Sequence, residues 1–245
     1  MNMTFLGKTD VGRVRETNQD KFAFYEFDES CRFAVLCDGM GGHNGGNVAS
    51  EIAIDTIKEF IVSGYMSDMY KNNIDALVLD AVNKADNKIF SESLKKPNLK
   101  GMGTTVVLAF ICKDKVYIAH AGDSRAYLYE DKQLLRLTID HSLVQEMIEL
   151  GQITAKEAEK HPYKNVITRA LGKGSDVELD MKVIDAVKGS YIMLCSDGLS
   201  NLLSMEDMEE IINDTPSEDL CEELISEANK KGGYDNITVV FIKCK

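Results

Sequence analysis

The feature that most constrains this chain is an apolar run that ends in an acid and is followed by glycines. Residues 33–37 read Phe-Ala-Val-Leu-Cys, which is typical of a strand buried on both faces. Asp38 follows directly, and residues 39–46 are rich in glycine. Placing a carboxylate beside a core strand costs free energy unless its charge is compensated. The stretch therefore raises the question of what Asp38 binds.

Three more acids stand at predicted strand boundaries. Asp123 and Asp197 each follow an apolar strand, and Asp235 precedes the last one, residues 237–243. If antiparallel pairing brings these ends to one edge, the four carboxylates converge and repel one another unless a cation lies among them. Mg²⁺ and Mn²⁺ prefer oxygen ligands of this kind. The pattern thus favours a hard divalent cation over zinc.

Each acid taken alone also fits a structural role. Asp-Gly is a common turn signal, and both Asp38 and Asp197 precede a glycine. However, helix-like residues follow both pairs, which argues against simple hairpins. Asp123 and Asp235 are as compatible with a capped turn as with a ligand site.

Motifs for other phosphate or nucleophile sites are incomplete. Gly39 and Gly41, followed by Asn44, do not complete the dinucleotide-binding pattern G-x-G-x-x-G. The sequence contains neither the P-loop pattern G-x-x-x-x-G-K-[ST] nor the nucleophile elbow G-x-S-x-G. A nucleotide-binding loop and a serine nucleophile of these types are therefore excluded.

The hydrophobic periodicity predicts a mixed α+β chain without a linker. Apolar residues recur with helical spacing after the glycine-rich loop and again in a second long segment. Strand-like apolar runs arranged as hairpins follow. Residues 141–172 differ, because they are polar and contain two short predicted helices. The predicted helices begin near residues 47 and 73, the hairpins cover 104–120 and 126–137, and an apolar strand covers 191–196.

Composition narrows the classes of partner. The 245 residues carry 40 acidic and 28 basic side chains, a net charge of −12, which argues against nucleic acid or an anionic membrane as a partner. The N-terminus lacks the apolar core of a signal peptide, so we expect a cytoplasmic protein. The six cysteines show no C-x-x-C pairing, and we expect them to be small buried side chains without disulfide or zinc roles.

The ordered motifs resemble those of metal-dependent protein phosphatases of the protein phosphatase 2C type. The likeness is greatest to small bacterial members that oppose Ser/Thr kinases, and it covers nearly the whole chain. Each motif alone is weak, whereas the ordered set is specific. The motifs are RETNQD at 15–20, DGMGGH at 38–43, GMGTT at 101–105, GDSR at 122–125, TRALG at 168–172, SDGL at 196–199 and DNIT at 235–238.

The resemblance implies a fold and a set of metal ligands. The fold would be a four-layer α-β-β-α sandwich, one catalytic domain over residues 1–245 with a helical flap at about 141–172. Asp38 would bridge two Mn²⁺ or Mg²⁺ ions, and the carbonyl of Gly39 would bind the second. Asp197 and Asp235 would complete the shell of the first ion, and Asp123 with Asp197 would bind a third.

Further roles are implied outside the ligand set. Arg15 would bind the phosphate, and Asp20 would orient water from behind the ligands. Eukaryotic relatives carry a histidine two positions after the first aspartate, where this chain has Met40. His43 lies close by and could protonate the leaving oxygen, or it could cap the following helix. The other histidines are expected to be structural or exposed.

The resemblance implies hydrolysis of phosphoserine and phosphothreonine in proteins by a hydroxide bridged between the ions. The implied partners are phosphorylated proteins and a cognate Ser/Thr kinase, and we expect a monomer. Two alternatives remain open: a catalytically silent phosphoprotein-binding module of the same fold, and a hydrolase of small phosphoesters. The flap could gate the site or be a surface excursion without such a role.

Overall fold

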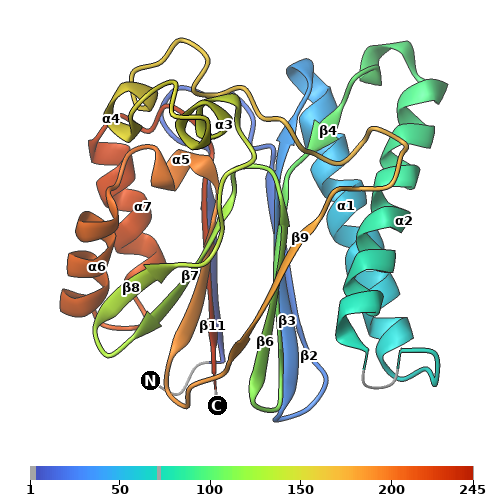
Figure 1. Ribbon diagram of the computed structural model, residues 1–245, viewed down its shortest axis with the longest axis horizontal. Coiled ribbons are helices and arrows are strands. Elements are labelled where there is room, and N and C mark those ends of the chain that lie inside the picture. Colours follow the sequence, from blue (N-terminus) through green and yellow to red (C-terminus); the bar gives the residue numbers. More distant parts are fainter. Residues whose placement is uncertain (1–3, 71–72, 245) are drawn as a thin grey trace.

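Two antiparallel sheets face each other in the computed structural model, which describes residues 4–70 and 73–244 (Figure 1). In the first sheet the strand order is β1-β11-β10-β7-β8, and in the second it is β2-β3-β5-β6-β9, with β4 paired to β3. The strands of the first sheet are β1 (Phe5–Asp10), β11 (Ile237–Lys243), β10 (Tyr191–Cys195), β7 (Arg125–Glu130) and β8 (Gln133–Arg136). Those of the second are β2 (Asp20–Glu26), β3 (Cys31–Met40), β4 (Gly103–Thr104), β5 (Val106–Cys112), β6 (Lys115–Ala121) and β9 (Asp180–Asp185).

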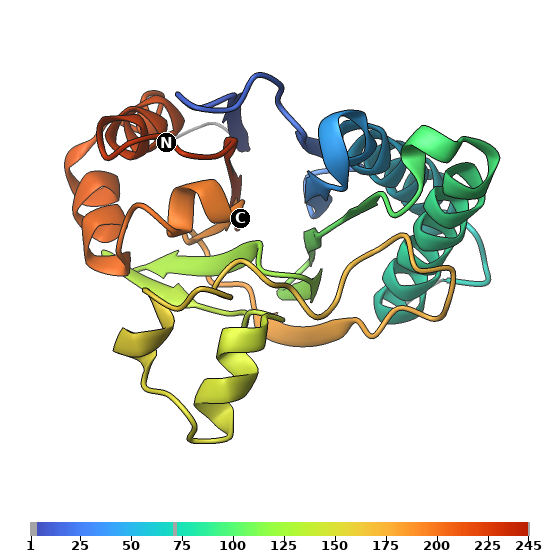
Figure 2. The same ribbon diagram turned by 90° about the horizontal axis from the view of Figure 1, so that it is seen from above.

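Helices cover the outer face of each sheet (Figures 1 and 2). The long pair α1 (Gly42–Tyr65) and α2 (Ile74–Lys95), followed by the 3₁₀ turn η1 (Pro97–Leu99), packs on the second sheet. The first sheet carries α5 (Asp197–Ser200), α6 (Met205–Asp214) and α7 (Leu220–Lys230). The predicted four-layer α-β-β-α sandwich is confirmed.

The apolar run of β3 is continuous because both of its faces are buried. Ala34 and Leu36 point into the core between the sheets, where they join residues such as Ile192 and Val240. The alternate residues, Phe33, Val35 and Cys37, pack beneath α1 and α2. Strands buried on both faces lose the polar alternation of surface strands. The strand extends two residues beyond Asp38, so the prediction that this acid ends the strand was wrong in detail.

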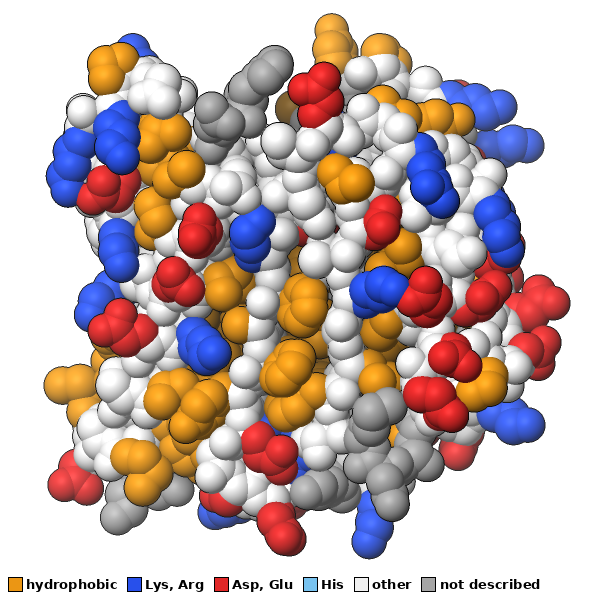
Figure 3. Space-filling model, turned by 180° about the vertical axis from the view of Figure 1, so that it is seen from behind, with side chains coloured by type: hydrophobic (Ala, Val, Ile, Leu, Met, Phe, Trp, Pro, Cys, Tyr) orange, Lys and Arg blue, Asp and Glu red, His pale blue; other side chains and the backbone are white. Residues whose placement is uncertain are grey.

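The edges of the two sheets approach each other at β1 and β2. Phe5 of β1 stacks on Phe24 of β2 with ring centroids 4.6 Å apart. Figure 3 shows hydrophobic side chains gathered between the layers on the rear face, flanked by charged ones. Aromatic contact thus links the sheets where no strand pairing does among the described residues.

The flap segment, residues 141–172, lies at the end of the sandwich opposite both termini (Figure 1). It contains α3 (Leu143–Glu149) and α4 (Ala155–Ala158), and the capping box predicted from Thr154 and Glu157 is present at α4. Antiparallel bridges close its two ends, Ser142 to Ile167 and Thr104 to Leu171. The first bridge joins the two ends of the flap segment to each other, and the second fixes its last residues to β4.

One pair of cysteines departs from the prediction. Cys31 and Cys112 are directly opposed on β3 and β5 and form a disulfide, so the expectation that no cysteine is disulfide-bonded was wrong for this pair. Sequence spacing could not reveal it, because the two residues are 81 positions apart and meet only through strand pairing. The other four are buried free thiols, as expected. Within the described ranges, every helix is too short or too polar to cross a membrane.

Candidate functional site

A pocket of about 730 Å³ opens at the flap end of the two sheets. Residues that the sequence singled out lie together on its wall: Arg15, Asp38, Gly39, Asp123, Asp197 and Asp235. They come from both sheets and from loops far apart in the chain, so strand pairing has brought the predicted acids to one edge. Asn165 and Ile167 of the flap segment complete the wall.

Asp38 is held in place by its backbone. Its N–H donates to Thr105 Oγ1 over 3.0 Å, and its carbonyl accepts from Thr104 Oγ1 over 2.8 Å. Thr105 Oγ1 also shares a 2.7 Å hydrogen bond with Ser124 Oγ, next to Asp123. Thr105 thus links the chain at Asp38 to the residue after Asp123, a role indicated in the sequence only by its place in a motif.

Asp20 lies behind the pocket, directly opposite Asp38 in the pairing of β2 with β3. It is 2% exposed, and its Oδ2 accepts hydrogen bonds from Ser196 Oγ and Thr238 Oγ1, both over 2.7 Å. Its Oδ1 is buried without a hydrogen-bond partner among the described residues. Burial is the main cause that raises the pKa of Asp20 to about 6. A buried carboxylate short of donors is suited to hold water or lie near a cation.

The acids on the pocket wall destabilise one another's charge. Burial, followed by repulsion from Asp20, Asp197, Asp123 and Asp235, raises the pKa of Asp38 well above its ordinary value. Burial also raises the pKa of Asp197 to about 6 and that of Asp123 to about 8. Such a set is stable in its charged form only beside cations, and its all-oxygen chemistry fits Mn²⁺ or Mg²⁺. The residues present therefore fit the predicted ions.

One cation of the protein already lies among these acids. Arg15 Nη2 donates to Asp235 Oδ2 over 2.7 Å, and the Arg15 side chain is 56% exposed toward solvent. The hydrogen bond to Asp235 raises the pKa of Arg15. The guanidinium therefore compensates one carboxylate and leaves the others without a protein cation in direct contact among the described ion pairs.

Asn236 is a site residue whose role the sequence did not indicate. Its Oδ1 accepts from the N–H of Gln19 over 2.8 Å. Its Nδ2 donates to the carbonyls of Val11 and Thr17, both over 3.0 Å. The loop that carries Arg15 is thereby fixed to the strand that follows Asp235. The only sequence signal was the position of Asn236 inside a motif.

Gly39 and His43 differ from the other predicted site residues in what the structure shows of them. Gly39 is required by packing, because a Cβ there would lie 2.1 Å from the carbonyl oxygen of Gly46 at the start of α1. The side chain of His43 lies outside the described residues, so its role stays a prediction. His120 and His141 are buried, in agreement with the structural role expected for them.

Comparison with known proteins decides the family. Residues 12–238 match the family described as Protein phosphatase 2C. The chain belongs to the protein phosphatase 2C family. Its 2C relatives include the protein phosphatase PhpP of Streptococcus pneumoniae, which is 38% identical and covers 96% of this chain and 94% of its own.

Solved structures agree with this assignment. The serine/threonine phosphatase of S. agalactiae has 35% sequence identity and a TM-score of 0.88, covering 98% of this chain and 99% of its own. The catalytic domain of the serine threonine protein phosphatase PstP, solved with 2 manganese ions, has 32% identity and a TM-score of 0.84, covering 98% and 96%. The predicted family and the fold class are confirmed, and the chain is a protein phosphatase of the 2C type.

Proposed function

We propose that this 2C phosphatase hydrolyses phosphoserine and phosphothreonine in proteins with two Mn²⁺ or Mg²⁺ ions, and that residues 1–245 act as one catalytic domain. The convergence of half-buried acids with raised pKa values in one pocket carries the proposal, because such a set requires cations to ionise together. The manganese ions of the PstP structure and the names of the relatives support it.

The proposed ligands follow the pocket wall. Asp38, the Gly39 carbonyl, Asp197 and Asp235 would hold the two ions, with Asp38 shared between them. Asp123 and Asp197 would hold a third ion. When bound, the ions supply a water of lowered pKa and neutralise charge on the phosphate oxygens during in-line displacement.

The remaining steps belong to side chains of the chain itself. Arg15 forms an ion pair with Asp235. When cations compensate Asp235 instead, the planar N–H groups of Arg15 are free to donate to two phosphate oxygens. Asp20 accepts a hydrogen bond from a water molecule through Oδ1, which has no partner among the described residues. His43 is our candidate for the donor that protonates the leaving serine or threonine oxygen.

The biological setting is part of the same proposal. The substrates would be phosphoproteins made by a cognate Ser/Thr kinase, and the enzyme would act as a cytoplasmic monomer. The four buried free thiols fit a reducing compartment, whereas the Cys31–Cys112 disulfide is the feature against it. Alkylation of freshly lysed cells followed by mass measurement distinguishes the two, since six labelled cysteines support the cytoplasm and four contradict it.

The decisive experiment is a Mn²⁺ titration of phosphopeptide hydrolysis, with Asp38→Asn as the inactive control. Saturable, metal-dependent release of phosphate from the wild type supports the proposal. Full activity in excess chelator would refute it. Metal binding without turnover would favour the silent binding module, and faster release from a sugar phosphate than from a phosphopeptide would favour a hydrolase of small phosphoesters.

A further inference from the structure

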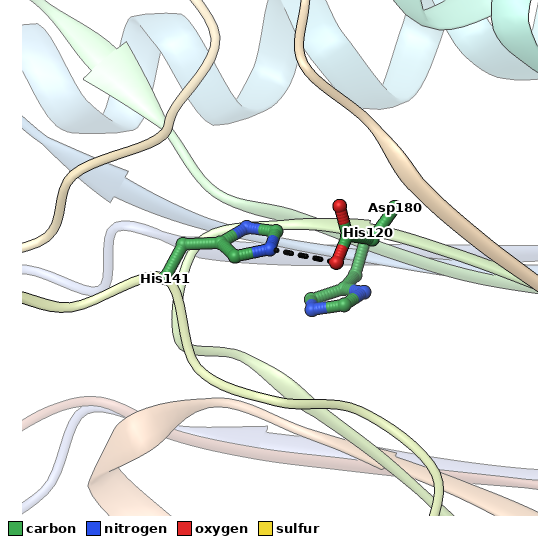
Figure 4. A group of neighbouring side chains, drawn as sticks. All are labelled: His120, His141 and Asp180. Atoms are coloured by element: carbon green, nitrogen blue, oxygen red, sulfur yellow. Dashed lines mark ion pairs between the residues drawn. The ribbon is translucent and has the colours of Figure 1, made fainter. Parts of the chain in front are cut away.

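A second cluster of ionisable side chains lies beside the pocket, next to the loop that carries Asp123. We call His120, His141 and Asp180, which Figure 4 shows, together with the neighbouring Arg169 the histidine clamp. His141 Nε2 lies 3.3 Å from Asp180 Oδ2, and Arg169 Nη1 lies 2.7 Å from Asp180 Oδ1. The ring of His120 stacks on that of His141 with centroids 4.5 Å apart. Three of these residues, His120, His141 and Asp180, have the composition of a metal site.

The hydrogen bonds of the clamp argue against a metal there. His141 Nδ1 accepts the N–H of Gly122 over 3.2 Å, so in the neutral ring the proton is on Nε2, which faces Asp180. Burial lowers the pKa of His141 and that of His120, which favours the neutral rings. Arg169 Nη1 is also 3.2 Å from His141 Nε2, so a cation already occupies the space that a metal would need. The cluster is therefore complete without an ion.

The clamp holds the loop around Asp123 from one side. In addition to the bond at Nδ1, the backbone N–H of His141 donates to the Gly122 carbonyl over 2.9 Å. The preceding residue, Asp140, accepts from Arg125 Nη2 over 2.7 Å. Residues 140–141 thus grip the chain immediately before and shortly after Asp123. Thr105 holds the other side through Ser124.

The same residue fixes the end of the flap segment. The N–H of Thr168 donates to the His141 carbonyl over 2.8 Å, and Arg169 follows with its contacts to His141 and Asp180. Ile167, one residue earlier, lies on the pocket wall. His141 is thus bonded both to the loop of a proposed metal ligand and to the flap residues that face the same pocket.

We infer that His141, oriented by Asp180 and Arg169, is a positioning residue that holds the Asp123 loop and the flap end in one fixed arrangement. Its consequence is that ion binding at Asp123 and the position of Ile167 on the pocket wall depend on hydrogen bonds of the same residue, His141. Groups that orient metal ligands without touching the metal commonly change metal affinity by about 10- to 100-fold. The inference rests on the proposed function and adds the residues that couple the flap to the metal centre.

The experiment compares clamp variants with matched controls. His141→Ala removes the side-chain acceptor of the Gly122 N–H, and Asp180→Ala removes the acid that orients His141, while the backbone bonds of residue 141 remain. His141→Gln can accept from Gly122 and donate to Asp180. Asp180 is half-exposed, so its variant is expected to fold. The controls are Asp185→Ala, an exposed acid on the same strand paired with Lys115, and His161→Ala within the flap segment. Each protein is assayed for Mn²⁺-dependent phosphopeptide hydrolysis, Mn²⁺ stoichiometry by calorimetry and amide hydrogen exchange.

We expect His141→Ala and Asp180→Ala to raise the Mn²⁺ midpoint for activity about tenfold and to lose the weakest bound ion. Amides at residue 122 and at 166–169 should exchange faster, while His141→Gln restores wild-type values and the controls do not change them. An unchanged Mn²⁺ midpoint and stoichiometry in both alanine variants would overturn the inference, whatever their stability. If the wild type binds no Mn²⁺, the proposed function fails instead, and unchanged exchange in the variants would separately refute the clamp.

Discussion

Two clusters of ionisable side chains lie side by side at the flap end of the sandwich, and they balance charge in different ways. On the pocket wall the half-buried acids Asp38, Asp123 and Asp197 have raised pKa values. In the histidine clamp the acid Asp180 has a lowered pKa and is paired with Arg169. The first cluster needs external cations, whereas the second supplies its own.

The difference shows that ligand-like composition does not by itself indicate a metal site. The clamp has two histidines and an acid in close contact, yet its polar groups are engaged within the protein: His141 accepts from Gly122, His120 is bonded to the Ile139 carbonyl and Arg169 donates to Asp180. Among the described residues the wall acids have few donors for their oxygens: Arg15 and the N–H of Asn236 donate to Asp235, and Asn201 donates to Asp197. The ratio of acceptors to donors therefore separates a site that binds ions from one that orients neighbouring groups.

The largest expected effect comes from neutralising the central acid. Asp38→Asn should lower Mn²⁺-dependent phosphopeptide hydrolysis by at least about 100-fold, more than the loss of an outer hydrogen-bond partner costs. In chelator the variant should melt at or above the wild-type temperature, because an amide removes one buried like charge. Hydrolysis rates and thermal melts measure both effects. Asp185→Asn is the control, and activity within tenfold of wild type would contradict the assignment of Asp38.

Metal removal tests how much cation binding at the acids on the pocket wall stabilises the folded protein. Saturation with Mn²⁺ at about 100 times its dissociation constant should stabilise the protein by about 2.7 kcal/mol, which raises Tm by about 5–10 °C for a chain of this size. Calorimetric melts with Mn²⁺ and with chelator measure the shift. Asp38→Asn should lose most of it, whereas His120→Phe should keep it. Equal melting temperatures with and without Mn²⁺ would mean that the acids do not form a cation site.

The pH dependence of stability should differ between the metal-free and the metal-bound protein. Folded-state pKa values of about 6 for Asp20 and Asp197 and about 8 for Asp123 lie above the ordinary value of 3.8. Unfolded carboxyls ionise first, so this contribution to stability is complete below about pH 4 and is lost as pH rises to about 8.

In chelator we expect Tm to fall by about 3 °C or more between about pH 5 and pH 8, since one pKa unit corresponds to about 1.4 kcal/mol. Saturating Mn²⁺ should flatten or reverse the slope. Asp123→Asn should reduce the fall above about pH 6. A metal-free Tm that rises through this range would show that the acids are not the groups that control stability.

The smallest expected effect concerns the clamp. His120→Phe keeps the stacking on His141 and removes the 2.8 Å bond from Nε2 to the Ile139 carbonyl. Chemical denaturation should show a loss of about 1 kcal/mol in the free energy of unfolding. The Mn²⁺ midpoint should stay unchanged, because His120 does not bond the Asp123 loop. Zn²⁺ that stabilises the wild type but not this variant would contradict the metal-free interpretation of the clamp.

Several features of the site were within reach of the sequence. The apolar runs before Asp38 and Asp197, and the run after Asp235, predicted which strand ends carry acids, and antiparallel pairing was the condition under which these ends would meet at one edge. Other features were not. Thr105, Asn236 and the clamp act through backbone groups of residues distant in the chain. Thr and Asn side chains of this kind occur in any loop, so their types carry no signal.

The flap segment shows the same difference between local interactions, which the sequence predicts, and contacts between distant residues, which it does not. Its helices and capping box were predicted from local residues, because capping depends on neighbours three positions apart. Its anchoring was not, since Asp86 of α2 accepts the backbone N–H groups of Gly172, Lys173 and Gly174 across the molecule. The Cys31–Cys112 pairing was missed for the same reason.

The sequence by itself determined the elements and the acids, because hydrophobic period and local motifs act over a few residues, whereas the four layers were implied by the family resemblance. The tertiary structure alone decided which groups meet Asp38: Asp20 across the strand pair, Asp197 from the other sheet and Thr105 beneath. It also decided that two histidines and an acid form a clamp instead of a metal site. Hydrogen-bond direction settles that distinction, and it depends on Gly122 and Ile139, whose backbones no side-chain pattern places.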